Sequence, residues 1–335
     1  KARFEFKTYD GNRNQMPVEN LIAEAIHQNL KYSDQSRSVL CIDNKTNEFQ
    51  QESLLKGFKY QGYTNIELLW RPIALCLYIL KQAQPGTFTE HEKIAIVDFD
   101  GIIPDVTVLS LKYMRNELVP VRCLPQKNHW FNGEYNSKDL KREFLKNVLN
   151  DEHSFKQLEC GPFSKDLFSF FDNGQKKDIY LRKNLYYERY QCDEEWIKQI
   201  PIFSFKNNSF QSLQRIIRNL DEYKSADYKF WHGFPCRIQA RSIFSDNEIL
   251  IEDNSAVSVG AADYGLRRSK NMPTYYDTLP GLEIFSNVEG GGHHFFKLIE
   301  AGEVEGGETI RIPEPIYRFL LEKDTNLFNT VLRYI

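Results

Sequence analysis

Several signals that would identify a class of protein at once are absent from this chain of 335 residues. No apolar run approaches the roughly 20 residues that a membrane-spanning helix needs, and the strongest candidate, Ile73–Leu80, lies between Arg71 and Lys81. No G-x-S-x-G, H-E-x-x-H or G-K-[ST] phosphate-loop motif occurs, and there is no internal repeat. We therefore expect no membrane span and none of the enzyme classes that those motifs mark.

Cysteine is sparse and scattered. Six cysteines occur, and no two of them form the C-x-x-C pair that is typical of structural zinc sites. A chain of this size does not need disulfides for stability, and no basic-plus-apolar leader precedes the first predicted elements. These features predict reduced thiols and a cytoplasmic location.

Neither sign of charge dominates, since the net charge is −3 and the isoelectric point is near 6.2. This balance predicts no nucleic-acid partner. One local exception is Lys176–Tyr190, where basic side chains alternate with tyrosines and could stack bases or hold phosphates. Asp178 and Glu188 dilute its charge, so a solvated helical face is the favoured interpretation.

The most informative segment of the sequence is Lys93–Lys112. Two apolar runs of strand length, Ile94–Val97 and Val106–Leu111, flank a turn that carries three carboxylates and one glycine. Such a hairpin can aim backbone N–H groups and a carboxylate at a phosphate–metal pair, or it can simply end in a solvated acidic turn. Both interpretations stay open at this point.

The rest of the pattern predicts an α/β layered fold. Strands and helices alternate before the hairpin, and a small-residue helix follows much later. The expected strands are Phe4–Lys7, Val39–Ile42, Ile66–Leu69 and Tyr228–Gly233, and the expected helices are Val18–Leu30, Phe49–Gln61, Pro72–Gln82, Leu140–Leu149, Phe210–Leu220 and Ala256–Leu266. The small face of the last helix, Gly260 to Ala262, is expected to pack against the sheet. Residues 138–225 are interpreted as a mostly helical insert, and short β segments are expected beyond Pro280. His293 and His294 are adjacent, which on a strand would place them on opposite faces, so a polar loop edge is favoured over a metal site.

In this order, six segments resemble the nucleotide-binding domain of the seventy-kilodalton heat-shock chaperones, which belong to the actin-like ATPase superfamily. The hairpin resembles that family's second phosphate loop, D-L-G-G-G-T-F-D-V-S, and Ala256–Ala262 resembles its A-V-A-x-G-A-A helix. The other matching segments are Pro17–Leu30 with Ser38–Asn44, Gln50–Leu80, Trp130–Glu134 and Trp231–Ile238.

The resemblance implies an incomplete actin/heat-shock-type ATPase fold with ribonuclease-H-like lobes. It implies a partial first lobe in residues 1–88, a second-lobe hairpin and phosphate loop in 89–137, a helical insert in 138–225, a second-lobe return in 226–280 and a β-rich extension in 281–335. The family's first phosphate-binding hairpin, with the lysine that follows it, has no counterpart in these residues.

The resemblance also implies a site for ATP or ADP with Mg²⁺. Asp98, as a tentative catalytic residue, would hold the metal through water, and Gly101 and Gly133 would approach phosphate. His232, Gly233 and Asn254 would lie near the nucleoside.

Departures from the family pattern favour weak or absent ATPase activity. Asp100 and Ile102 replace two phosphate-loop glycines, Ile103 replaces a threonine, and Arg71 stands where the family has a glutamate. Isoleucine neither lets backbone approach a phosphate nor adopts positive φ freely. Arg71 could instead pair with Asp98 or Asp100 and close the cleft without nucleotide. Two hypotheses follow: a divergent nucleotide-binding protein that couples ATP to binding of a protein partner or client, or a non-hydrolysing scaffold that keeps only the fold and needs no cofactor.

Overall fold

The computed structural model describes a mixed α/β protein. It covers residues 3–7, 13–29, 38–101, 104–122, 129–130, 177–183, 186–192, 209–233, 236, 244–279, 281–288, 292–307 and 332–334. Within these residues, no helix is both long enough and apolar enough to cross a membrane.

The N-terminal part follows the predicted alternation of elements. A hairpin of β1 and β2 leads into α1. Strands β3 and β4 then form a two-stranded parallel sheet, and α2 connects them along the chain. Their bounds are Arg3–Lys7 for β1, Arg13–Pro17 for β2, Val18–Asn29 for α1, Ser38–Ile42 for β3, Glu48–Tyr60 for α2 and Ile66–Trp70 for β4. Helix α2 begins at a capping box, because Asn47 and Gln50 each accept a hydrogen bond from the other's backbone N–H. The expected strands and helices in this part are confirmed, and β2 is an addition.

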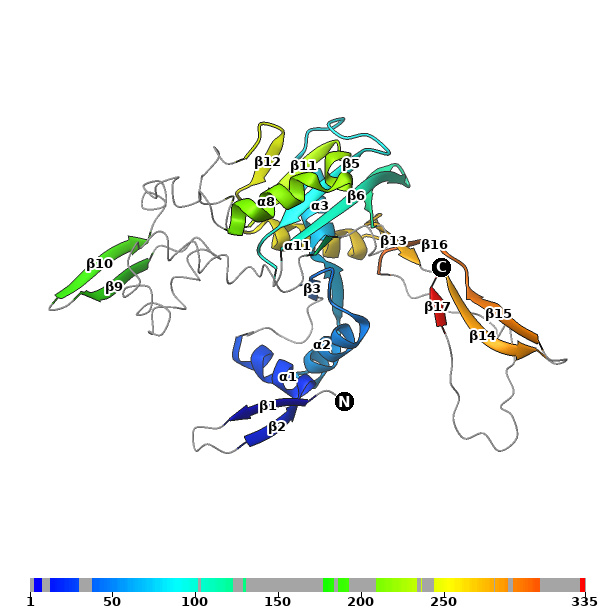
Figure 1. Cartoon of the computed structure of the whole chain (residues 1–335), viewed down its shortest axis with the longest axis horizontal. Coiled ribbons are helices and arrows are strands. Elements are labelled where there is room, and N and C mark those ends of the chain that lie inside the picture. Colours follow the sequence, from blue (N-terminus) through cyan, green and yellow to red (C-terminus); the bar gives the residue numbers. More distant parts are fainter. Residues whose placement is uncertain are drawn as a thin grey trace.

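An eight-stranded mixed sheet forms the centre of the molecule (Figure 1). Its strand order is β12-β11-β5-β6-β7-β13-β16, and β8 also pairs with β6. The bounds are Glu248–Ile251 for β12, Tyr228–His232 for β11, Lys93–Asp98 for β5, Asp105–Met114 for β6, Glu117–Val121 for β7, Tyr276–Leu279 for β13, Gly302–Glu305 for β16 and His129–Trp130 for β8. Strands β5, β6 and β7 are successively antiparallel, whereas β11 is parallel to both β5 and β12. The hairpin predicted at Lys93–Lys112 is therefore confirmed as β5 and β6.

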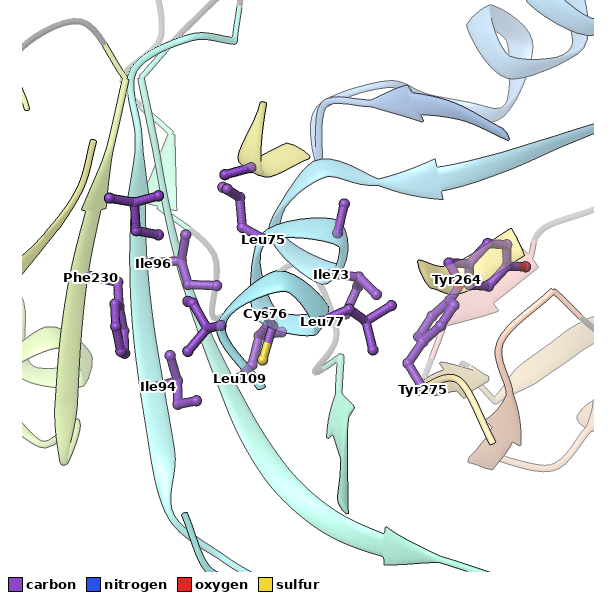
Figure 2. Packing of buried hydrophobic residues seen from close by; sticks show 14 of the residues in the cluster. Ile73, Leu75, Cys76, Leu77, Ile94, Ile96, Leu109, Phe230, Tyr264 and Tyr275 are labelled. Atoms are coloured by element: carbon purple, nitrogen blue, oxygen red, sulfur yellow. The ribbon is translucent and has the colours of Figure 1, made fainter. Parts of the chain in front are cut away.

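Helices cover both faces of this sheet. On one face, α3 (Arg71–Gln82) packs on the even-numbered residues of β5, including Ile94 and Ile96, and α11 (Ala256–Ser269) packs on α3 within the same core cluster (Figure 2). On the other face, α8 (Ser209–Asn219) and the short α9 (Asp221–Lys224) contact the aromatic side chains of Phe99 and Trp231. The sheet is thus the middle layer of a three-layer α/β arrangement.

Helix α11 packs against α3 rather than against the sheet, which corrects the sequence-based expectation for its small residues. A Cβ added at Gly260 would lie only 1.8 Å from the carbonyl oxygen of Ala74 in α3. The glycine therefore lets two helix backbones approach each other closely. The small face of α11 therefore packs on α3, and α3 lies between α11 and the sheet.

The predicted helical insert is only partly supported. Helix α8 confirms the helix expected at Phe210–Leu220. The expectation of a helical face at Lys176–Tyr190 is wrong, because β9 (Lys177–Lys183) and β10 (Tyr186–Cys192) form an antiparallel hairpin. The helix expected at Leu140–Leu149 lies outside the described residues.

The β segments expected beyond Pro280 are present in the described part of the C-terminal region. Strand β14 (Leu282–Val288) pairs with β15 (Gly292–Ile299) and with β17 (Leu332–Tyr334). His293 and His294 are consecutive residues of strand β15, so the expectation of a loop edge is wrong. Strand β16, by contrast, belongs to the central sheet through β13, so the extension is not wholly separate from it.

Candidate functional site

The candidate site lies at the end of strand β5, where Asp98 is buried and only 4% exposed. The guanidinium of Arg71 donates two hydrogen bonds to this carboxylate, from Nε to Oδ2 at 2.7 Å and from an Nη atom to Oδ1 at 3.2 Å. Nδ1 of His232 lies 2.9 Å from Oδ1 of Asp98, and the backbone N–H of Asp100 also donates to that oxygen at 3.1 Å. Both oxygens of Asp98 are thus engaged by groups of the protein.

The secondary structure brings these side chains together. Asp98, the last residue of β5, is paired in register with His232 at the end of the parallel strand β11. Residues in register on adjacent strands share a face of the sheet, so His232 and Asp98 meet on the face that α3 covers. Arg71 is the first residue of α3, which follows β4 directly. A cation at a helix N-terminus is unfavourable for the helix dipole, and Asp98 offsets this cost.

The electrostatics of the pair favour its charged form. Burial alone would raise the pKa of Asp98, but the charge of Arg71 and the hydrogen bond with His232 outweigh burial and hold that pKa well below its ordinary range. Burial would likewise lower the pKa of Arg71, but Asp98 raises it. Asp98 and Arg71 therefore form a buried ion pair at neutral pH.

A second buried polar cluster lies beside the first, across the hairpin. Asp105 pairs in register with Asp98, and its Oδ2 accepts hydrogen bonds from Asn44 at 2.8 Å and from Thr107 at 3.3 Å. Burial raises the pKa of Asp105 to about 7, because the bond from Asn44 offsets only part of that effect and the charge of Asp98 adds to it. Oδ1 of Asp105 and Oδ1 of Asn44 are buried and find no hydrogen-bond partner among the described residues.

Gly233 closely approaches the turn between β5 and β6. Its φ is +110°, and an added Cβ would lie 2.9 Å from the Cβ of Phe99 and from Oδ1 of Asp100. Both the backbone conformation and the close contact therefore require glycine. The backbone N–H of Phe99 also donates to the carbonyl of His232 at 3.0 Å.

The structure thus brings together part of the predicted site. Asp98, Gly101, His232 and Gly233 come from the same end of β5 and β11 and the turns that follow them. Asn254 follows β12 at the same edge of the sheet, since Ile251 pairs in register with His232, and it lines a groove between α11 and β3. Gly133, together with Ile102 and Ile103, lies outside the described residues.

The residues of this site do not fit a magnesium–nucleotide group. A water-held Mg²⁺ would need the carboxylate oxygens of Asp98 as acceptors, and both already bind the guanidinium of Arg71. In the described part of the chain, no group of three or more His, Cys, Asp or Glu side chains is arranged to hold a metal ion. Arg71 supplies the positive charge that a metal would bring.

Sequence reasoning missed the cluster of Asn44, Asp105 and Thr107. The only sequence feature that pointed to this cluster was the position of Asn44 just after an apolar strand. Polar side chains at the ends of strands often belong to binding sites in α/β proteins. It also missed Arg122, whose guanidinium lies 3.8 Å from the ring centroid of Trp70 and donates to Asp277 at 3.1 Å.

Comparison with known proteins assigns no family to this chain. No protein-family model matches it, and neither does any curated protein. The resemblance to chaperone nucleotide domains therefore stays a prediction that rests on six short motifs and their order.

Proposed function

We propose that the chain is a degenerate relative of the actin-like ATPases that keeps the fold as a protein-interaction scaffold and does not hydrolyse ATP. The observation that carries this proposal is the bidentate ion pair of Arg71 and Asp98, with His232 on the same carboxylate. The pair occupies the acceptor atoms that the nucleotide-linked metal would need.

The order of strands supports the kind of fold. Three successive antiparallel strands, β5 to β7, are followed by β11 and β12, which add in parallel beside β5. This order, with helices on both faces, supports the proposal of a ribonuclease-H-like lobe, of which actin-like ATPases contain two. The parallel pair β3 and β4 with α2 between them is compatible with the remainder of a first lobe.

The chemistry of phosphoryl transfer explains why activity should be lost. Catalysis of that reaction depends almost entirely on positioning and on electrostatic stabilisation. Loss of one well-placed donor typically costs about 2–4 kcal/mol of transition-state stabilisation, or about 10²–10³ in rate. Ile102, Ile103 and Arg71 each replace a group of the family's site, and together they should leave turnover near background.

Nucleotide binding coupled to a partner is the second candidate. It is favoured by the position of Asp98 at the end of β5 and by the close approach of Gly233 to the following turn, since the resemblance implies that both residues belong to one nucleotide site. ATP with Mg²⁺ would have to displace Arg71 from Asp98 before binding. The free thiols of Cys41 and Cys76 fit the cytoplasmic location that we propose for either function.

Isothermal titration of the chain with ATP and Mg²⁺ distinguishes the two candidates. For the scaffold, we expect no saturable heat up to about 1 mM nucleotide, which corresponds to binding weaker than about −4 kcal/mol. ATP hydrolysis should also stay at background in the same preparation. Saturable binding or robust hydrolysis that disappears in Asp98→Ala would refute the scaffold proposal and favour the nucleotide-binding candidate.

A further inference from the structure

A groove runs along the edge of strand β3, between that strand and helix α11. Its volume is about 820 Å³. Three consecutive residues of β3, Val39 to Cys41, line it. Only alternate residues of a strand face one side of a sheet, so consecutive lining residues show that the groove follows the strand's edge. The opposite wall is one face of α11, on which the lining residues recur every three or four positions.

The edge that faces away from β4 carries backbone groups available for pairing. The N–H of Ser38 donates to the carbonyl of Asn65, next to β4, and the parallel ladder repeats every second residue. The N–H and C=O groups of Val39 and Cys41 therefore point away from β4. No strand in the described part of the chain pairs with this edge.

In the described part of the chain, β3 and β4 form a parallel sheet of only two strands, which is unusual. Parallel sheets are almost always covered and continued by further strands, and an isolated two-stranded sheet is marginal in water. Unpaired N–H and C=O groups along an edge form a template for another strand. Among the described residues, β3 thus lies beside α11 with one side of its ladder unpaired.

The lining of the groove defines what could fill it. Among the described residues, eleven line the groove and none of these is Asp, Glu, Lys, Arg or His, although 27% of the chain is charged. The helix wall offers small side chains such as Ala262 and Gly265, and the 50% exposed side chain of Leu266. A charged occupant would lose its hydration without gaining a counter-ion here, whereas an uncharged one would bury apolar surface.

We propose that β3 and α11 form a docking site for an uncharged, extended segment of a partner polypeptide, which adds to β3 as a further strand. Backbone hydrogen bonds to Val39 and Cys41 supply affinity, and the small residues of α11 select small or β-branched side chains at alternate positions. This site adjoins the pair of Arg71 and Asp98, because the charges of both residues act on the pKa of Cys41. The partner segment nonetheless uses backbone groups of β3 and the wall of α11, so its docking can be measured apart from nucleotide binding.

The test uses a fluorescently labelled nine-residue peptide of alternating valine and threonine. Fluorescence polarisation should show saturable binding to the intact chain. The same peptide with alternate amides N-methylated should bind at least about tenfold more weakly, because it cannot donate to the edge of β3. Hydrogen exchange of the free chain should be faster at the amides of Val39 and Cys41 than at those of Leu40 and Ile42, and the peptide should slow the faster pair.

Two variants address the site directly. Val39→Pro removes an outward-facing N–H and leaves the ladder to β4 intact, as proline does on edge strands. Ala262→Glu places a charge on the exposed helix wall and keeps the fold testable should the proline variant unfold. Each should weaken peptide binding at least about tenfold, whereas Leu55→Glu, a matched change on an exposed position of α2, should not.

The outcomes are separable. Absence of saturable peptide binding to the intact chain, or equal binding by Ala262→Glu, would overturn the proposal. Self-association in sedimentation that Ala262→Glu abolishes would show that a second copy takes the edge, and would overturn the proposed partner. Titration with ATP and Mg²⁺ in the same samples tests the scaffold function alone, so failure of one proposal is not mistaken for failure of the other.

Discussion

Replacing Arg71 by methionine tests the ion pair that closes the candidate site. The substitution keeps an unbranched side chain but leaves the carboxylate of Asp98, whose side chain is 6% exposed, without its bidentate partner. Removing one member of a buried pair typically costs about 3–5 kcal/mol, because the remaining charge is buried and uncompensated. His232 and the N–H of Asp100 still bond Asp98, so we expect a loss near the lower end of that range.

A double-mutant cycle isolates the pair from other effects of the substitution. The free energy of unfolding would be measured by urea denaturation for the intact chain, Arg71→Met, Asp98→Asn and the double variant. We expect a coupling energy of about 2–3 kcal/mol. Arg115→Met is the matched control, because Arg115 is half exposed and pairs with Glu305, and exposed pairs contribute only about 0–1 kcal/mol. Coupling below about 0.5 kcal/mol between Arg71 and Asp98 would show that our account of the site is wrong.

The pH dependence of the same variant has a defined sign. In the intact chain the pKa of Asp98 is depressed, so its stabilising contribution is complete above its ordinary pKa near 4 and declines as pH falls below that value. Without Arg71, burial should raise the pKa of Asp98, and the resulting penalty should disappear once the carboxyl is protonated. The destabilisation caused by Arg71→Met should therefore be largest at pH 7 and smaller at pH 4–5. A loss that is independent of pH would contradict this reasoning.

Three further changes test other parts of the fold. Gly260→Ala should cost about 1–3 kcal/mol in urea denaturation, because its Cβ would lie 1.8 Å from a carbonyl oxygen of α3, whereas Gly265→Ala, whose nearest contact is 3.4 Å, should be neutral or stabilising. Asp105→Asn should become more stable relative to the intact chain as pH rises from about 4 to 7. The pKa of Asp105 is raised to about 7 in the folded state, so over this range the folded intact chain holds a proton that the unfolded chain releases. Parallel pH profiles of stability for the two proteins would refute this. Tyr223→Phe should cost about 1–3 kcal/mol by thermal or urea unfolding, because its hydroxyl makes buried hydrogen bonds of 2.7 and 2.8 Å, and an unchanged stability would contradict that role.

The elements that sequence predicted correctly are those with strong periodicity. Helix α3 is an apolar helix opened by Pro72, and β5 is a short apolar run with a carboxylate at its end, so each carries its own local signal. The pairing of Arg71 with Asp98 was one of two partners expected from the resemblance, and it is confirmed. The sequence did not show which neighbour the small face of α11 packs against, because small residues fit against a helix and a sheet equally well.

The error at β9 and β10 has an identifiable cause. Lysine, arginine and tyrosine occur in both helices and strands, so composition alone could not separate the two. The spacing of the segments was a usable signal, because two seven-residue runs that both contain tyrosine are separated in the sequence by only residues 184–185. Such spacing is typical of a β-hairpin. The strands β12 and β13, each of four residues, were missed because they are too short for periodicity to be read.

The ion pair also bears on whether nucleotide could still control this protein. A ligand that must first separate Arg71 from Asp98 has its apparent affinity reduced by the free energy of that separation. At about 3–5 kcal/mol, the reduction is roughly 10²–10⁴-fold, which turns micromolar intrinsic binding into binding near or above the millimolar range. A partner that docks on β3 and α11 avoids this cost, because the groove is open while the pair stays intact. The ion pair therefore weakens nucleotide binding without closing the groove in which we propose that a partner docks.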